Sequence, residues 1–341
     1  MKKLSKNNAL TKNEVERART LHERASIIEA LTYIPIVNDP AYFSRMIGAG
    51  ISGVHVTIPD SYDTHRECMR KISGWYAALD SLDNILMVKS ADDISRAKQE
   101  KKVAIIMGSQ TAEILDGEVG MLSIYDKLGL KILQIAHYKQ NLLGAGCFES
   151  KDHGLTDFGV KVVEEMNRLK MLIDISHCGE QTSSDVLEAS KYPVAATHAN
   201  PRKIANHFRN KSDDQIKALA EKNGVIGMNA WSRFVTERNE QPSLDRFMEL
   251  LEYTINLVGA DHVGLGLDLT PMWTESEYTV FRSKFPALCD PFTFETRYVK
   301  GLSDHTGIFK VTKALVALGY SDQEILKILG GNWLTLFRNV W

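Results

Sequence analysis

Short apolar runs alternate with amphipathic segments along most of the chain. Eight of these runs have the length and composition of buried strands: residues 27–34, 53–58, 103–107, 131–136, 171–176, 193–197, 225–229 and 262–267. Continuous apolar runs of this length are typical of strands that are buried on both faces. Eight such strands alternating with helices predict an α/β fold, a (β/α)8 TIM barrel with its functional site at the C-terminal ends of the strands.

The predicted helices follow the same alternation, at residues 41–49, 75–85, 91–100, 121–127, 158–169, 183–190, 212–222, 243–257 and 309–318. Capping boxes at Thr11–Glu14 and Ser321–Glu324 predict two more helices. The first of these belongs to an N-terminal helical extension, residues 1–25. No linker divides the sequence, so we expect residues 1–341 to form a single domain.

Residues 271–304 follow the last predicted strand and are rich in aromatic side chains without a clear helical period. Such a long loop in a compact fold usually acts as a lid or a binding loop. A flap that covers the core or a second copy of the chain is the alternative. The sequence therefore leaves open whether this segment shapes a pocket or the interface of a homodimer.

Composition points to a small-molecule substrate. Charged residues make up 25% of the chain and the net charge is −2, so nothing indicates binding to nucleic acid or to a membrane surface. The four cysteines are scattered without a CxxC pair, which is typical of a reducing compartment. No apolar run is long enough for a signal peptide or a membrane span, and we expect a cytoplasmic protein.

Polar side chains gather where the predicted strands end, at Tyr33, Thr57, Gln110, His137, His177, His198, Asn229 and Asp268. His177 and His198 are 21 residues apart, so one strand–helix–strand step places both imidazoles at the same edge of the barrel. Two neutral imidazoles and the carboxylate of Asp268 are suitable ligands for zinc or a similar divalent ion. A single histidine at a strand end is more often structural, and only the combination favours a metal site.

Other polar residues have simpler interpretations. A neutral amide such as that of Gln110 is a poor metal ligand, and Arg209 could form surface ion pairs with nearby aspartates. The direction of His55 depends on the register of its strand, and a structural role is favoured for it. The remaining histidines considered are expected to be non-functional: His22, His65, His207 and His262.

Four ordered blocks of the sequence form a specific pattern. The densest block is GLTDFGVKVVEEMNRLKMLIDISHCG at residues 154–179, and the others are THANPRKIANHFRNKSDD (197–214), GLGLD (264–268) and GGNW (330–333). Together they resemble the renal or membrane dipeptidase family, the M19 metallopeptidases. The resemblance covers most of the chain, and a chance match over four ordered blocks is not a serious alternative.

The resemblance implies roles for individual residues. His177 and His198 would hold one zinc ion, and His137 would polarise the scissile carbonyl or stabilise the tetrahedral intermediate. Arg209 would bind the terminal carboxylate of the substrate, for which a planar guanidinium is suited. Asp268 would contact the metal-bound water and pass its proton to the leaving amine, and Asn229 is a further candidate for substrate binding.

Departures from the family pattern concern the first and third strands. Two-metal members carry a His-x-Asp pair where this chain has Leu31, Thr32 and Tyr33, and a bridging glutamate where it has Gln110. We therefore expect a divergent branch with one ion, held by His177, His198 and Asp268, with Gln110 as a weak ligand or a hydrogen-bonding partner of the water. Glu113 and Glu118 are close enough in sequence to replace the bridge, but this alternative is disfavoured.

Three functions compete at this point. The leading one is metal-dependent hydrolysis of a dipeptide or a small amide with a carboxylate group. The second keeps the metal for a non-peptide reaction, such as opening a lactam or lactone or a lyase-type proton abstraction. The third is a catalytically silent homologue that only binds a ligand, which the lost ligands make realistic.

Overall fold

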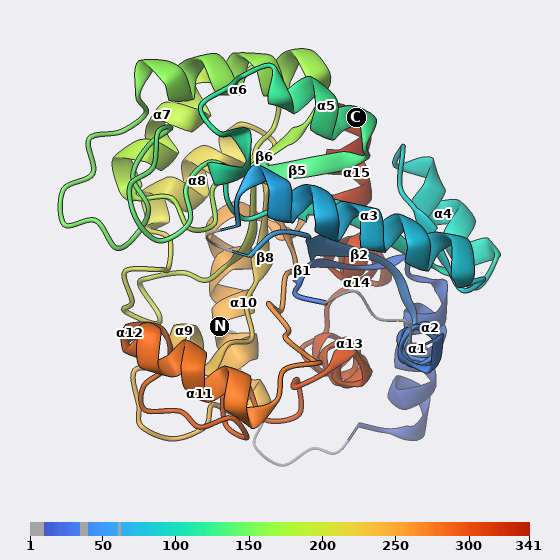
Figure 1. Cartoon of the computed structure of the whole chain (residues 1–341). Coiled ribbons are helices and arrows are strands. Elements are labelled where there is room, and N and C mark those ends of the chain that lie inside the picture. Colours follow the sequence, from blue (N-terminus) through green and yellow to red (C-terminus); the bar gives the residue numbers. More distant parts are fainter. Residues whose placement is uncertain (1–9, 35–39, 61–62) are drawn as a thin grey trace.

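Eight parallel strands form a closed barrel in the computed structural model, which describes residues 10–34, 40–60 and 63–341 (Figure 1). In barrel order they are β1 (Ile27–Thr32), β2 (Ile51–Thr57), β4 (Val103–Ser109), β5 (Leu130–Gln134), β6 (Leu172–Asp174), β7 (Ala195–Ala199), β8 (Val225–Met228) and β9 (Val263–Leu265). Glu29 pairs with Val54 of β2 on one side and with Leu265 of β9 on the other, which closes the barrel. The predicted (β/α)8 fold is confirmed.

A ninth short strand, β3 (Ile85–Met87), was not predicted. It pairs with the first residues of β4, from Val103 to Ile105, whereas β5 pairs with β4 from Met107 onward. β2 pairs with β4 along its other edge, so β3 and β5 lie one after the other along the same edge of β4. The predicted helix 75–85 is wrong at both ends: α3 runs from His65 to Ser81, and Ile85 begins the strand.

Helices surround the barrel (Figure 1). Along the chain they are α1 (Lys12–Arg24), α2 (Pro40–Gly48), α3, α4 (Asp92–Gln99), α5 (Met121–Lys127), α6 (Asp157–Leu169), α7 (Glu180–Ala189), α8 (Asp213–Glu221), α9 (Ser232–Val235), α10 (Leu244–Val258), α11 (Glu275–Lys284), α12 (Pro286–Cys289), α13 (Ile308–Ala317), α14 (Asp322–Leu326) and α15 (Asn332–Val340). The capping boxes predicted at Thr11 and Ser321 are both present. Within the described residues, no helix has the length and apolarity needed to cross a membrane.

The N-terminal helix packs against the C-terminal part of the chain. Arg17 of α1 forms an ion pair of 2.7 Å with Asp322 of α14 and donates a hydrogen bond to the carbonyl oxygen of Tyr320. The buried residues of α1 are Ala18 and Leu21. The described part of the predicted N-terminal extension is therefore joined to the last helices.

The segment 271–304 is not a loop throughout, because it contains α11 and α12. A capping box between Thr274 and Glu277 starts α11, and within this fully described helix only Tyr278 is buried. One buried position in ten residues gives no visible helical period, which is why the sequence pattern missed the helix.

Candidate active site

Six of the eight predicted strand-end residues line one cavity of about 470 Å³. They are Tyr33, Thr57, Gln110, His137, His177 and Asp268. The other two, His198 and Asn229, are fully buried and do not line it. The C-terminal ends of the strands therefore do meet, as parallel strands in a barrel require.

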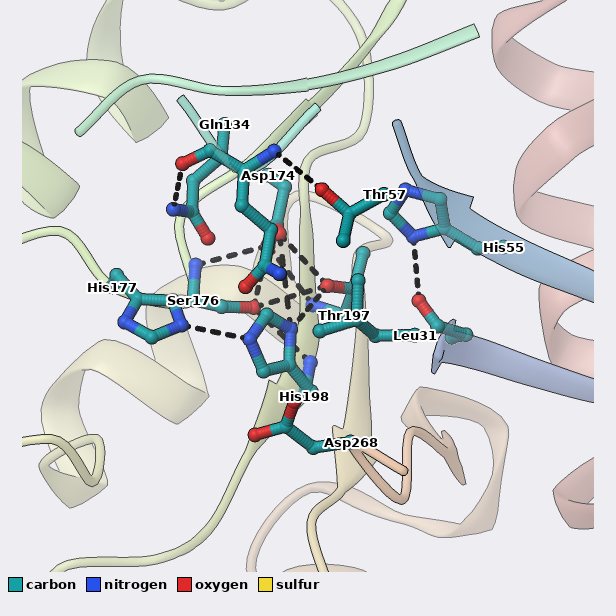
Figure 2. Close-up of polar contacts among 12 residues, drawn as sticks. Leu31, His55, Thr57, Gln134, Asp174, Ser176, His177, Thr197, His198 and Asp268 are labelled. Carbon is teal, nitrogen blue, oxygen red and sulfur yellow. Dashed lines mark hydrogen bonds and ion pairs between the residues drawn. The ribbon is translucent and has the colours of Figure 1, made fainter. Parts of the chain in front are cut away.

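The two strand-end histidines point toward one another. The Nε2 atoms of His177 and His198 are 2.9 Å apart (Figure 2). Thr197 donates its hydroxyl hydrogen to Asp174, so its oxygen accepts from Nδ1 of His198 at 2.7 Å. Nδ1 of His198 therefore carries the proton, and Nε2 presents its lone pair toward His177.

Burial keeps these imidazoles neutral. The pKa values of His177 and His198 lie well below the usual value because of desolvation, with a further contribution from the charge of Arg209. The same causes lower the pKa of His137 to about 3. The rings of His137 and His177 are 4.3 Å apart between centroids. Neutral imidazole is the form that binds a metal ion or donates a neutral hydrogen bond.

Asp268 is held in an unusual backbone conformation beside the pair. Its φ is 61°, in the left-handed region, and Tyr298 donates a hydrogen bond of 3.0 Å to its carbonyl oxygen. Nδ2 of Asn229 donates to its carboxylate at 3.0 Å. Burial raises the pKa of Asp268, while Arg209 and Asn229 lower it. A carboxylate in such surroundings is suited to proton transfer.

Comparison with known proteins identifies the family. The chain matches the family model of membrane dipeptidases (peptidase family M19) over residues 16–278. The chain belongs to the membrane dipeptidase family. By that membership it is a metallodipeptidase-like hydrolase.

Individual relatives are distant in sequence and similar in fold. An uncharacterised protein in the pqqA 5′ region of Klebsiella pneumoniae is 28% identical, over 76% of this chain and 91% of that protein. Dipeptidase tcpJ of Claviceps purpurea is also 28% identical, over 76% of this chain, but the match spans only 56% of that longer protein. The crystal structure of an amidohydrolase from Pseudomonas aeruginosa superimposes with a TM-score of 0.86 at 28% identity, covering 95% of this chain and 99% of that one.

The candidate site fits a metal ion only in part. Nε2 of His198 presents a lone pair, because the hydroxyl of Thr197 keeps the proton of that ring on Nδ1. Nε2 of His177 donates the hydrogen of the 2.9 Å bond between the two rings, so His177 would bind an ion through Nε2 only with its proton on Nδ1. However, no group of three or more His, Cys, Asp or Glu side chains among the described residues is arranged to hold a metal ion. The expected third ligand is not in place in this structure, so Asp268 as a ligand remains a prediction. Catalytic zinc sites usually have three protein ligands.

Glu113 and Glu118 do not supply the missing carboxylate, since neither lines the cavity of the histidines, and Gln110 is a neutral amide. The backbone of Gln110 is bonded to Thr57 and Gln134, and its side chain faces the cavity, so a contact with a bound water stays a prediction. Glu113 accepts hydrogen bonds from Thr111 and Asn141 and lines a different cavity.

Arg209 lies behind the two histidines. Its side chain is 1% exposed, and its terminal nitrogens donate to the carbonyl oxygens of Ser176 and His198, the second at 2.7 Å. It thus ties together the ends of both histidine-bearing strands. Its Nε is buried without a hydrogen-bond partner among the described residues, and its contact with a substrate carboxylate remains a prediction.

Three buried groups inside the barrel were missed or set aside from sequence. Asp174, on the strand that leads to His177, accepts from Ser176 and Thr197. Glu29 accepts from the backbone N–H of Leu267 at 2.6 Å, and burial raises its pKa to about 8. His55 is buried in the interior, contacts the carbonyl oxygen of Ala30 and leaves Nε2 without a partner in the described part of the chain. A polar residue inside an apolar strand was the available signal for all three.

Proposed function

We propose that this dipeptidase-family chain hydrolyses a dipeptide, or a small amide with a carboxylate group, with the help of one divalent metal ion. The observation that carries the proposal is the convergence of two neutral imidazole nitrogens, from His177 and His198, where their strands end at the substrate-sized cavity. Buried imidazoles in this arrangement favour metal binding over a purely structural role.

His177 and His198 would hold the ion, with Asp268 or Gln110 as further donors, and zinc is the ion we expect. A divalent ion bound there supplies activation of water near neutral pH and polarisation of the substrate carbonyl. The hydrogen bond from Nδ1 of His198 to Thr197 keeps the proton on Nδ1, so Nε2 is unprotonated and able to bind an ion even in the metal-free protein.

The remaining residues would divide the work on the substrate. Asp268 accepts the proton of the attacking water and returns it to the leaving amine. His137, neutral because its pKa is about 3, donates a hydrogen bond to the oxyanion. Asn229 keeps the carboxylate of Asp268 oriented. Arg209 holds the histidine strands and provides positive charge for a substrate carboxylate.

A catalytically silent ligand-binding homologue is the second candidate. It is favoured by the lack of a three-ligand cluster among the described residues. In that case the same cavity would bind a carboxylate ligand without turnover.

The test combines metal analysis with a hydrolysis assay on purified protein. We expect about one equivalent of divalent metal and hydrolysis of dipeptides, both lost in His177→Ala and His198→Ala and both retained in His153→Ala, which alters an exposed histidine. Metal and turnover that survive in both site variants would contradict the proposal. Binding of dipeptides without metal or turnover would support the second candidate, and turnover of lactams alone would indicate a non-peptide hydrolase.

A further inference from the structure

Aromatic rings form a continuous surface from the histidines to the rim of the active-site cavity. We call Tyr33, Tyr138, Trp273, Phe281 and Phe285 the aromatic wall. Tyr138 lies 5.1 Å from the ring of His177 and 4.9 Å from that of Phe285. Phe281 lies 5.1 Å from Phe285 and 5.0 Å from Trp273, which in turn lies 6.1 Å from Tyr33. All five rings line the same cavity as His137, His177 and Asp268.

The wall faces the cavity and is not simply part of the core. Phe281, Phe285, Trp273 and Tyr33 are only partly buried although each ring contacts its neighbours. Partly exposed aromatic surface in a cavity gains free energy when a ligand removes it from water. A flap that merely covered the core would have buried these rings.

The segment 273–290, which carries three of the five rings of the wall and contains α11 and α12, is fixed in place. Nε1 of Trp231, which follows β8, donates a hydrogen bond of 2.6 Å to the carbonyl oxygen of Leu288 in α12. The ring of Trp231 also lies 6.2 Å from that of Phe281. Arg282 of α11 donates to Asp290 at 2.6 Å, which ties α11 to the residue after α12. The wall is therefore organised before a ligand binds, which reduces the entropic cost of binding.

Phe281 and Phe285 lie beyond the stretch that matches the family model, which ends at residue 278. Both rings line the cavity, and neither carries a group that could transfer a proton or bind a metal ion. They are therefore positioned to affect which substrate is bound and not how the bond is broken.

We propose that the aromatic wall makes this site select substrates with a ring-sized apolar side chain next to the scissile amide bond. This inference rests on the proposed hydrolase function, because it concerns the substrate of the same site. The cavity of about 470 Å³ accommodates such a side chain together with a dipeptide backbone. A substrate with only methyl side chains would leave the rings of the wall exposed to water.

The experiment compares Phe-Phe with Ala-Ala in the wild type, in Phe281→Ala/Phe285→Ala and in Phe281→Leu/Phe285→Leu. We expect kcat/KM to favour Phe-Phe by about 10- to 100-fold in the wild type, the range for burying one aromatic side chain. The kcat/KM ratio of Phe-Phe to Ala-Ala should fall about tenfold in the alanine variant and less in the leucine variant. The leucine variant keeps apolar volume at both positions, so it still tests the wall if the alanine variant is unstable. Phe309→Ala, a partly buried phenylalanine of α13 that lines another cavity, should leave the ratio unchanged.

A binding measurement separates this inference from the proposed function. Isothermal titration calorimetry with the reduced-amide analogues of Phe-Phe and Ala-Ala, which cannot be hydrolysed, requires no turnover. If no dipeptide is hydrolysed, the proposed function fails. The preference for aromatic side chains would still be supported if the Phe-Phe analogue binds at least ten times more tightly than the Ala-Ala analogue and this difference decreases in the wall variants. Equal Kd or kcat/KM values for the two ligands in the wild type, or a ratio that the wall variants leave unchanged, would overturn the inference.

Discussion

The two halves of the strand-end rim use polar residues in different ways. On β5 to β9 the chain places His137, His177 and Asp268 on the cavity, and the buried His198 contacts His177. On β1, β2 and β4 the corresponding residues are Tyr33, Thr57 and Gln110, none of which is a strong metal ligand. The residues that we propose to act on the substrate, His137 and Asp268, therefore both lie on one half of the rim.

The titratable groups of the second half lie deeper and interact with the backbone. Glu29 of β1 binds the N–H of Leu267, and His55 of β2 contacts the carbonyl oxygen of Ala30. Both side chains are buried at 0% and 1% exposure. The difference teaches that a buried carboxylate or imidazole in this barrel is not by itself a catalytic group. His137, His177 and Asp268 differ from Glu29 and His55 in that they line the open cavity.

The largest expected difference between the halves is catalytic. Asp268→Asn removes the group that accepts a proton, and we expect kcat for dipeptide hydrolysis to fall by about 10²- to 10⁴-fold. Gln110→Ala, on the opposite half of the same cavity, should change kcat less than tenfold. Steady-state kinetics on both variants, with thermal unfolding as a control for folding, measures the contrast. Similar losses in the two variants would refute the division of the rim.

A smaller effect concerns the free energy of unfolding and a buried residue of the other half, Glu29 of β1. Native Glu29 keeps its proton up to about pH 8, whereas the unfolded chain releases it near 4.5, so its contribution to stability is lost as pH rises between these values. Glu29→Gln does not titrate and should gain stability relative to the wild type from pH 5 to pH 8, by on the order of a few kcal/mol. Urea unfolding at both pH values measures this, with the exposed Glu221→Gln as control. A pH-independent difference would show that Glu29 is ionised in the fold.

The smallest expected effect is that of Asn229, which orients the carboxylate of Asp268, on the pH dependence of kcat/KM. The hydrogen bond from Asn229 lowers the pKa of Asp268, so Asn229→Ala should raise that pKa. Because Asp268 must be ionised to accept a proton, the acid limb of the kcat/KM profile should move to higher pH. The measurement is the pH dependence of kcat/KM for one dipeptide. An acid limb that stays in place would mean that another group controls it.

Much of the fold was predictable because the strands are buried on both faces. Runs such as 103–107 are continuously apolar, and the strand order follows from the alternation with helices. Several short or exposed elements escaped for physical reasons. β3, α9 and α12 have only three or four residues each, and α11 buries only Tyr278, so none of them leaves a periodic pattern. The helical ends that were predicted best are those with a side-chain cap, such as Thr11 and Ser321.

The candidate site was predictable as a set of positions but not as a geometry. The sequence placed His177 and His198 at one edge, because parallel neighbours in a barrel end together. It did not indicate that Thr197 and Asp174 fix the tautomer of His198, or that Arg209 donates to two backbone carbonyl groups. Those contacts join residues on different strands, and strand order alone does not state the direction of a side chain.

The sequence by itself determined the barrel, the strand-end histidines and membership of the dipeptidase family, since apolar periodicity and ordered motifs are local properties. The tertiary structure decided which polar groups face the cavity and which are bound to the backbone. It also decided that the ring of Tyr33, which follows β1, meets the rings of the segment 273–285 in one wall. Distances between residues hundreds of positions apart depend on how helices pack on the barrel. That packing is a property of the whole chain and not of any segment.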